Sequence, residues 1–441
     1  MGSFKHIGVA RVLAAVLLFA FAAFVLLSFS KEAFDAKALL FMALVMLLIL
    51  VQHMLLAWLI PHGDRLMAML VSFLMTVGLV IQYRLNSSNA LNQLVFSCMG
   101  IVAMLIMLVL MKKPVVMLYL RIPAAIASVG ILLALLFIGK EYGGAVNWIS
   151  IAGIMFQPSE FVKVAMILIL AGSMSEKTEV KKLIMPTLFA VTVAALLVIQ
   201  RDLGAAMLMA MVYLTMFYAS TGKLGTTLLG AAACGAGATA SYFIFDHVRR
   251  RVAVWQDPWA TYSTSGFQIA QGLMAIASGG LWGMGLGEGS PKLIPAYQTD
   301  YIFAVICEEF GIVFGIGIMA IYLLIVIRGC MTALNSNNRF VSLCAFGASA
   351  LIAVQAFIII GGVIKLIPLT GITMPYVSYG GSSLIACMML HGVLQSAADY
   401  NGRMLERELY DEQYGADNGY DEYDDEAGDD GAYEYSGEGE A

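Results

Sequence analysis

Residues 37–60 read KALLFMALVMLLILVQHMLLAWLI, a run in which only Lys37 and His53 can carry a charge. An α-helix needs roughly 20 mainly apolar residues to cross the hydrocarbon core of a bilayer. Apolar runs of this kind recur along the chain as far as residue 398. In lipid, a helix satisfies every backbone polar group within its own segment. Each run therefore predicts a transmembrane helix.

The composition of the whole chain agrees with this interpretation. Of 441 residues, 60% are hydrophobic and only 12% are charged, whereas soluble domains carry roughly 25% charged residues. We predict an all-α polytopic membrane protein of about 12 transmembrane helices. The expected spans are 10–29, 37–60, 65–82, 92–111, 119–138, 158–174, 182–199, 203–220, 223–245, 302–328, 339–364 and 375–398.

The charges are distributed unevenly. The formal net charge is -5, but residues 401–441 hold 15 of the 30 acids and only two arginines, so residues 1–400 are net basic. The end of the chain alternates Tyr with Asp, Glu and Gly, a composition that cannot bury enough apolar surface to fold alone. We expect residues 401–441 to form a disordered acidic tail, which either binds a cytoplasmic protein or is simply solvated. No nucleic-acid partner is expected. No redox or zinc site is expected either, because the six cysteines are scattered and form no CxxC.

Basic residues in the short loops predict the orientation. They lie in four loops that the span count places on one side: Lys112, Lys113 and Arg121; Lys177, Lys181 and Lys182; Lys223; Arg328 and Arg339. The positive-inside rule makes this side cytoplasmic, and both termini share it. Lys31, Lys37 and Arg249 to Arg251 fall on the outer side against the rule, although long loops obey it poorly.

The predicted organisation has four parts. Residues 1–64 form an N-terminal two-span extension, residues 65–400 a transmembrane core, and residues 401–441 the tail. Residues 246–301 form a large extracytoplasmic loop within the core. Ionisable residues at membrane depth are costly and mark functional sites by default, and here they gather in the segments assigned to the outer side.

Two short segments place charges near the outer ends of spans. Residues 157–163 read QPSEFVK, so Glu160 and Lys163 lie three apart on one helix face,. They either line a site or form an ion pair that reduces the cost of two buried charges. Residues 200–204 read QRDLG, a short turn in which Arg201 is either a surface residue or a phosphate ligand.

The long outer loop carries further candidates. Arg249, Arg250 and Arg251 lie near its start, followed by Asp257 and then Gln268. Residues 279–287 read GGLWGMGLG, but the run lacks the lysine-serine pair and the strand–helix context of a phosphate-binding loop,. These glycines instead favour a re-entrant backbone that lines a cavity.

Two more polar segments follow. Residues 299–311 read TDYIFAVICEEFG, with Asp300 at the start of an expected span and Glu308 about two turns into it. Glu308 and Glu309 either serve a site or pair with Lys163 or Lys365 across the bundle. Residues 368–383 read PLTGITMPYVSYGGSS and include Ser378 in a glycine-rich entry to the last span.

The segments at 157–163, 299–311 and 368–383, in this order and spacing, resemble the SEDS family of shape, elongation, division and sporulation proteins, whose members include FtsW, RodA and SpoVE. The resemblance covers roughly residues 115–398. It implies a ten-span core, to which the first two spans are an addition. It further implies polymerisation of peptidoglycan glycan strands from the precursor lipid II, at the outer face of the bacterial cytoplasmic membrane, with a class B penicillin-binding protein.

One departure from the family pattern concerns the long loop. Family members carry a further Asp-Pro just before the glycine-aromatic-Gln sequence, and that acid would fall at Thr261, with Tyr262 at the proline. Asp257 is the only acid in this stretch. Either Asp257 supplies the carboxylate, or the catalytic arrangement has changed.

The resemblance and the residues together predict an inverting transfer from a polyprenyl diphosphate donor to a sugar hydroxyl of lipid II. We expect Asp257 to be the base that takes the hydroxyl proton. Cationic groups stabilise the diphosphate, and a divalent cation such as Mg²⁺ on Asp300 or Glu308 is a further option. The expected substrate-binding residues are Lys163, Glu160, Arg201, Gln268, Asp300, Glu308, Lys365 and Ser378.

Two other functions stay open at this point. A lipid II flippase would also place polar residues inside spans, and a non-catalytic scaffold for the penicillin-binding protein would tolerate the missing loop aspartate. The sequence does not decide between division, elongation and sporulation, nor does it give the oligomeric state.

Overall fold

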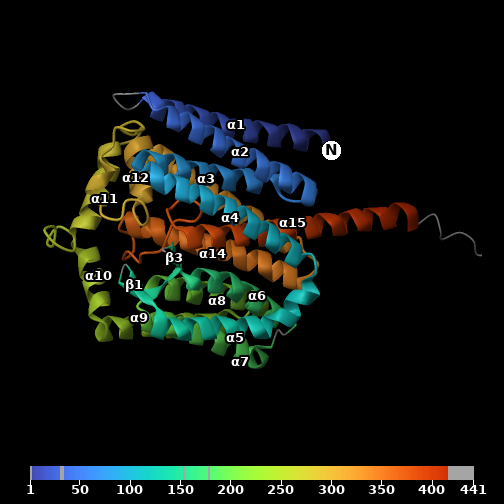
Figure 1. Cartoon of the computed structure of the whole chain (residues 1–441). Coiled ribbons are helices and arrows are strands. Elements are labelled where there is room, and N and C mark those ends of the chain that lie inside the picture. Colours follow the sequence, from blue (N-terminus) through green and yellow to red (C-terminus); the bar gives the residue numbers. More distant parts are fainter. Residues whose placement is uncertain (1, 30–33, 143, 152–153, 177–178, 416–441) are drawn as a thin grey trace, which may run out of the picture. The chain divides into compact units, whose positions relative to one another are not determined.

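The computed structural model of the chain describes residues 2–29, 34–142, 144–151, 154–176 and 179–415. Helices dominate this part of the chain (Figure 1). They are α1 Gly2–Phe29, α2 Ala36–Leu59, α3 Arg65–Leu85, α4 Ser87–Met111, α5 Pro114–Ile138, α6 Pro158–Ser175, α7 Ile184–Ile199, α8 Leu203–Thr221, α9 Leu224–Ile244, α10 Asp246–Gln256, α11 Phe267–Gly279, α12 Ile302–Phe310, α13 Ile312–Leu334, α14 Arg339–Val363 and α15 Gly381–Gly415. Two short 3₁₀ helices, η1 Val180–Leu183 and η2 Pro291–Leu293, are added to these.

The polytopic helical fold predicted from the apolar runs is confirmed. Within the described residues, 11 helices are long and apolar enough to cross a membrane. The expected span at 182–199 is replaced by η1 and the 16-residue helix α7, which is shorter than a full crossing.

Polar side chains at the helix starts explain several boundaries. The Asp64 carboxylate accepts a hydrogen bond from the Met67 amide at the start of α3, and Asp202 does the same for the Ala205 amide in α8. Such caps satisfy amides that have no partner within the helix. Pro114 and Pro158 occupy the first positions of α5 and α6, where the missing N–H costs nothing.

The expected span at 302–328 is wrong in one respect. The chain breaks at Gly311, which separates the nine-residue helix α12 from α13. Gly311 adopts a φ of +89°, and a Cβ there would lie 2.3 Å from the Leu281 carbonyl oxygen. The membrane-crossing helix is therefore α13, and Glu308 lies before it in α12 rather than two turns into a span.

The segments between the spans also contain regular structure, including strands that an all-α prediction omits. β1 Lys140–Tyr142, β2 Ala145–Ile151 and β3 Ile154–Phe156 form an antiparallel sheet in the order β1-β2-β3. The expected loop at 246–301 contains α10, α11 and η2. The last span begins at Gly381 instead of residue 375, because residues 364–380 form an irregular segment.

The chain divides into two units, Met1–Asn401 and Gly402–Ala441. The helix that begins at Gly381 continues to Gly415, and the prediction of a disordered tail from residue 401 remains a prediction. The remainder of the predicted tail, residues 416–441, lies outside the described residues.

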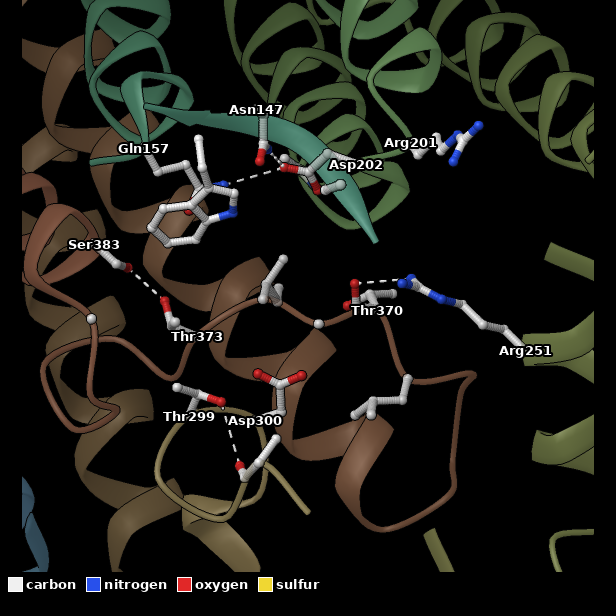
Figure 2. A pocket seen from close by; sticks show the side chains of 18 of the residues that line it. Asn147, Gln157, Arg201, Asp202, Arg251, Thr299, Asp300, Thr370, Thr373 and Ser383 are labelled. Carbon is white, nitrogen blue, oxygen red and sulfur yellow. Dashed lines mark hydrogen bonds between the residues drawn. The ribbon is translucent and has the colours of Figure 1, made fainter. Parts of the chain in front are cut away.

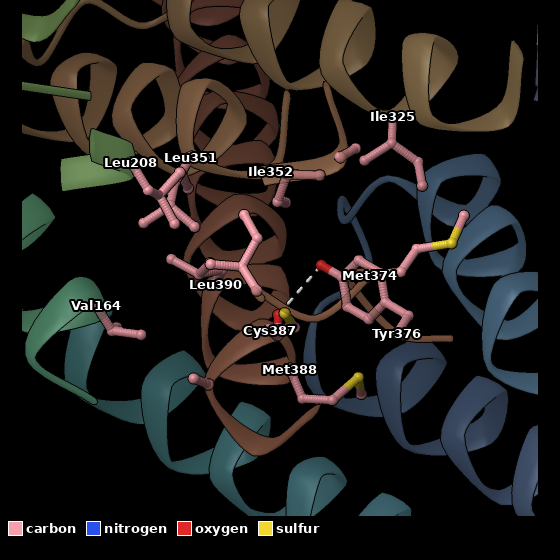
Figure 3. Close-up of a cluster of buried hydrophobic side chains, with 14 of the residues drawn as sticks. Val164, Leu208, Ile325, Leu351, Ile352, Met374, Tyr376, Cys387, Met388 and Leu390 are labelled. Atoms are coloured by element: carbon pink, nitrogen blue, oxygen red, sulfur yellow. Dashed lines mark hydrogen bonds between the residues drawn. The ribbon is translucent and has the colours of Figure 1, made fainter. Parts of the chain in front are cut away.

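The core of the first unit is built around α14, which packs against α6, α8 and α13. Figure 3 shows part of this core, where the buried Tyr376 hydroxyl donates a hydrogen bond to the Cys387 carbonyl oxygen at 3.1 Å. Tyr376 belongs to the irregular segment before α15, so this contact fixes that segment against the helix bundle. A second apolar cluster joins α1 and α2 to α3, with Phe24, Phe41 and Tyr83 in mutual ring contact.

Candidate functional site

A polar cavity of about 630 Å³ lies where the sheet, α10, α11 and the irregular segment before α15 meet (Figure 2). Its lining comes from sequence segments far apart in the chain. The polar and ionisable lining residues are Asn147, Trp148, Gln157, Glu160, Arg201, Asp202, His247, Arg250, Arg251, Ser265, Gln268, Thr299, Asp300, Thr370, Thr373, Tyr379, Ser382 and Ser383.

Asp202 is held on one side of this cavity by its neighbours. Its carboxylate caps α8 through the Ala205 amide, at 2.9 Å, and accepts the side-chain amide of Asn147 at 2.6 Å. The Gln157 side-chain amide adds a longer contact of 3.4 Å (Figure 2). Burial raises the pKa of Asp202, and the Ala205 N–H opposes this shift,. Asp202 is thus a fixed acceptor that orients two amides at the cavity wall.

Asp300 projects from the opposite side of the cavity (Figure 2). Burial raises the pKa of its carboxyl, while Thr299 and Arg251 act in the other direction. The backbone beside it is anchored, because the Ser378 hydroxyl donates to the Thr299 carbonyl oxygen at 2.7 Å. A carboxylate with a raised pKa on a fixed backbone is suited to accept a proton.

Cationic side chains form a third side of the cavity. The Arg251 guanidinium donates to the Thr370 carbonyl oxygen at 3.1 Å (Figure 2). Arg201 adopts a φ of +63° in the turn between α7 and α8, and its side chain stays exposed. Arg250 and His247 complete this side. Burial lowers the pKa of His247, and the positive charge of Arg251 is the next largest cause. The lining of the cavity therefore combines guanidinium groups with the carboxylates described above.

The starts of two helices are tied together at the cavity floor. The Gln157 amide donates to the Ser382 hydroxyl at 3.0 Å, which joins the start of α6 to α15. Thr373 and Ser383 share a hydrogen bond of 2.6 Å (Figure 2). The segments 157–163 and 368–383, which the sequence singled out separately, therefore meet at one site.

The structure brings together four of the predicted site residues. Glu160, Arg201, Gln268 and Asp300 all line the cavity. Lys163 does not line it, but its ammonium lies 2.6 Å from the Glu160 carboxylate, with both side chains buried. Lys163 thus compensates the charge of a lining residue, as the spacing of three indicated.

Three other predicted residues lie outside the cavity lining. Ser378 is buried and bonds Thr299 and the Met374 amide. Lys365 is partly buried, and its carbonyl oxygen accepts the Trp255 indole N–H at 3.1 Å. Glu308 accepts the Ser290 amide at 3.0 Å. Ser378 and Glu308 support the surrounding loops.

Of the two alternatives for Glu308 and Glu309, the pairing with Lys163 or Lys365 is wrong. Lys163 pairs with Glu160, and Glu309 pairs with Arg84 of α3 at 3.2 Å. Arg84 also donates to the carbonyl oxygens of Gly287 and Gly289. The two glutamates therefore hold the glycine-rich stretch 283–290 against α12.

The family model described as cell cycle protein, FTSW_RODA_SPOVE, matches residues 64–402. This chain belongs to the SEDS family. The peptidoglycan glycosyltransferase RodA of Mycobacterium leprae is 34% identical over 365 residues, covering 76% of this chain and 77% of that relative. The stage V sporulation protein E of Bacillus subtilis is 33% identical, with 77% and 97% covered.

Solved structures share the fold of this chain. A chain of a peptidoglycan synthase complex, described as coordinating polymerization and crosslinking, superposes with a TM-score of 0.68 at 25% identity, covering 77% of this chain and 98% of its own length. The rod shape determining protein RodA of Thermus thermophilus gives a TM-score of 0.58 at 24% identity, with 76% and 96% covered. The latter likeness concerns the fold alone.

The two positions that matter where this SEDS protein departs from the family pattern, Asp257 and Thr261, do not line the cavity. Asp257 is exposed, and its carboxylate caps the following turn by accepting the Trp259 and Ala260 amides at 3.0 and 3.1 Å. Thr261 accepts the Gly266 amide through its carbonyl oxygen. Neither residue belongs to the cavity lining. The prediction that Asp257 is the base remains a prediction.

The described part of this SEDS protein contains no preassembled metal site. No group of three or more His, Cys, Asp or Glu side chains suited to a metal ion occurs among the described residues. Asp300 lines the cavity and Glu308 does not. Asp300 alone remains the candidate for a cation shared with a bound substrate, and no catalytic step below depends on one.

Sequence reasoning overlooked His247 as a site residue. It lies two residues before the run at Arg249 to Arg251, and it lines the cavity with Arg250 and Arg251. The signal was present, because residues on one face of a short helix at a loop entrance share their surroundings. The segment was interpreted only by the charges of Arg249 to Arg251, and His247 was left out.

Proposed function

We propose that this SEDS protein is a peptidoglycan glycosyltransferase that polymerises lipid II into glycan strands. Its family and its relatives named peptidoglycan glycosyltransferase support this activity. The observation that carries the proposal is the cavity itself, whose lining contains the carboxylates of Asp300 and Asp202 together with the guanidiniums of Arg201 and Arg251. A transfer from a sugar diphosphate needs a base for the attacking hydroxyl and cations for the leaving group, and the cavity holds both.

In the proposed reaction, a sugar hydroxyl of lipid II attacks the anomeric carbon of the growing glycan. A new glycosidic bond forms with inversion, and the bond to the polyprenyl diphosphate breaks. Asp300 takes the hydroxyl proton, because it is the lining carboxylate with the fewest fixed partners. Arg201 and Arg251 compensate the charge that develops on the departing diphosphate. The carboxylate of Asp202 orients Asn147 and Gln157 toward the sugars.

Asp257 is the alternative base. It could act only if the segment 257–266 moved so that its carboxylate left the Trp259 and Ala260 amides. Asp300 needs no such movement, since it already lines the cavity. The two candidates for the base therefore lead to different expected results in the same polymerisation assay.

The protein is a multi-pass protein of the bacterial cytoplasmic membrane. We further propose that the cavity opens to the outer face, with both ends of the chain in the cytoplasm. The basic loops support this orientation. We also propose a class B penicillin-binding protein as partner, which is supported by the likeness to a chain of a peptidoglycan synthase complex.

The deciding experiment is polymerisation of purified lipid II by the full-length protein. We expect Asp300→Asn to lower the rate by about 10²- to 10⁴-fold, the usual contribution of a positioned base. Asp257→Ala is expected to retain the rate within a few-fold. Glu176→Gln, which removes a partly exposed carboxylate paired with Arg121, is the control for the loss of any acid.

The outcomes separate the candidates. A large loss in Asp257→Ala with none in Asp300→Asn assigns the base to the loop. Failure of the wild type to polymerise, alone or with a penicillin-binding protein, rejects the glycosyltransferase and leaves transport or scaffolding.

A further inference from the structure

The segment 257–266 between α10 and α11 exposes two aromatic side chains, Trp259 and Tyr262. Trp259 is 54% exposed and Tyr262 is 38% exposed. Their ring centroids lie 6.3 Å apart, and the two ring planes differ by only 17°. The two rings therefore present one aromatic surface to the surroundings, which is called the aromatic platform below.

The aromatic platform is held in place by its neighbours. The Tyr262 amide donates a hydrogen bond to the Trp259 carbonyl oxygen at 3.2 Å. From α11, the Gln271 side-chain amide donates to the Tyr262 hydroxyl at 3.0 Å, and the Phe267 ring meets the Tyr262 ring edge-on at 5.4 Å. Rings that are already fixed lose little freedom when a ligand binds. The platform is thus prepared for a ligand before the ligand arrives.

The segment that carries the platform begins and ends beside the polar cavity. Val254, three residues before the segment, lines the cavity, and so do Ser265 and Gln268 at its other end. Between these anchors the segment projects from the ends of α10 and α11, away from the helix bundle (Figure 1). The platform therefore lies within one short loop of the cavity lining and beyond the ends of the spans.

The composition of the segment favours a polar ligand over lipid. Trp and Tyr also gather at the bilayer surface, but a segment that enters lipid gains most from aliphatic side chains. Residues 257–266 contain no Leu, Ile, Val or Met. Besides the two aromatic residues they carry four hydroxyl side chains: Thr261, Ser263, Thr264 and Ser265. The segment therefore combines flat apolar faces with hydrogen-bonding groups.

A pyranose sugar has the matching chemistry. Its ring faces carry C–H groups with a partial positive charge, which suit the negative face of an aromatic ring. Its hydroxyls lie at the edge of the ring, where Ser and Thr side chains can donate or accept hydrogen bonds. An exposed aromatic surface rimmed by such groups marks an interaction site.

We propose that the aromatic platform binds pyranose rings of the growing glycan, beyond the sugar that reacts in the cavity. The inference rests on the proposed glycosyltransferase function and adds a site for the polymer to it. Sugars held by Trp259 and Tyr262 keep the strand on the protein between successive transfers. The strand is then extended many times before it dissociates.

The first test measures binding of chitotetraose, a soluble N-acetylglucosamine oligomer, to the full-length protein by ligand-observed NMR. The protein is kept in a detergent without a sugar headgroup. We expect Trp259→Ala to weaken binding about fivefold, the usual size of one aromatic ring contact. Trp259→Phe keeps a ring and should retain most of the affinity.

Trp282→Ala is the matched control for the first test. Trp282 is 80% exposed and does not line the cavity, so its removal should leave chitotetraose binding unchanged. Equal affinity in Trp259→Ala and wild type overturns the proposal, and so does an equal loss in Trp282→Ala and Trp259→Ala.

The second test compares the lengths of the glycan strands that wild type and variants make from lipid II, at equal conversion of the substrate. Trp259→Ala and Tyr262→Ala should make shorter strands, because the strand dissociates earlier. Tyr262→Phe loses the hydrogen bond with Gln271 but keeps the ring, and it should make longer strands than Tyr262→Ala. Unchanged strand lengths in both alanine variants reject the role of the platform in elongation.

Failure of this inference differs from failure of the proposed function. If Trp259→Ala binds chitotetraose and polymerises lipid II like the wild type, the platform has no role but the glycosyltransferase stands. If the wild type binds chitotetraose through Trp259 but never forms glycan, the sugar site stands while the proposed reaction fails. If Trp259→Ala only releases a co-purified penicillin-binding protein, the rings form a protein interface and the sugar site is rejected.

Discussion

At the scale of single residues, the ion pair between Arg84 and Glu309 shows how burial determines the contribution of an ion pair to stability. The Glu309 side chain is fully buried and Arg84 is 22% exposed. Removing one partner of a buried pair leaves a charge without compensation and costs about 3 kcal/mol. We expect Arg84→Ala to lower the unfolding free energy by about this amount. Arg249→Ala, which breaks the exposed pair with Asp246, should cost about 0.5 kcal/mol.

The same pair predicts a pH dependence. Burial, opposed by Arg84, raises the pKa of Glu309 to about 7 from an ordinary value of 4.5. The folded state therefore holds this proton more tightly than the unfolded state, and stability falls as pH rises between about 4.5 and 7. Without Arg84 the charged form costs more, so the loss in Arg84→Ala should be larger at pH 8 than at pH 6. Thermal midpoints in detergent measure both effects, and an equal loss at both pH values would contradict the assignment.

How far single residues could be predicted depends on the distance between partners in the chain. The spacing of Glu160 and Lys163 made their pair one of two alternatives, because helix geometry fixes neighbours three apart. The partner of Glu309 lies in α3, more than two hundred residues away, and no local pattern indicates it. Asp300 was identified by its polar segment, but its position opposite Asp202 emerges only when five distant segments meet.

At the scale of elements, the break between α12 and α13 depends on glycine. The positive φ of Gly311 is strained for residues with a side chain, and its Cβ would meet backbone atoms of Leu281 and Gly283. Gly311→Ala should displace α12 and the Asp300 segment before it. We expect a polymerisation rate at least tenfold lower and a lower thermal midpoint.

Gly317→Ala is the matched control on α13, because a Cβ at that glycine meets nothing within 4 Å. It should polymerise like the wild type. Normal activity in Gly311→Ala would show that the break between the two helices does not position Asp300.

Elements were predicted well where hydrophobicity alone sets them. The observed starts of α3, α5, α6 and α8, each of which carries a capping side chain or a proline, lie close to the starts of the expected spans. The break at Gly311 was not predicted, because the stretch 302–328 is mostly apolar and long enough to be one span despite Glu308 and Glu309. The close approach of residues 281–283 requires that break, and this contact is tertiary.

At the scale of the whole molecule, the N-terminal helices α1 and α2 lie outside the match to the SEDS family, which begins at residue 64. They pack on α3, and Phe19 of α1 contacts Phe73, Phe310 and Phe314. Asp35 accepts the Tyr83 hydroxyl at 3.1 Å. This packing reaches the junction of α12 and α13 but contributes no residue to the lining of the reaction cavity.

Because α1 and α2 pack on the core but do not line the cavity, we predict separate effects of their removal on activity and on stability. A protein that begins at residue 64 should still polymerise lipid II, because its reaction cavity is lined only by residues between 145 and 383. Its thermal midpoint should fall, since the apolar face of α3 and the rings of Phe310 and Phe314 lose their cover. Polymerisation and thermal unfolding of the truncated and full-length proteins, side by side in detergent, measure the two effects separately. Full stability with lost activity would instead make α1 and α2 part of the catalytic apparatus, acting through the junction at Gly311.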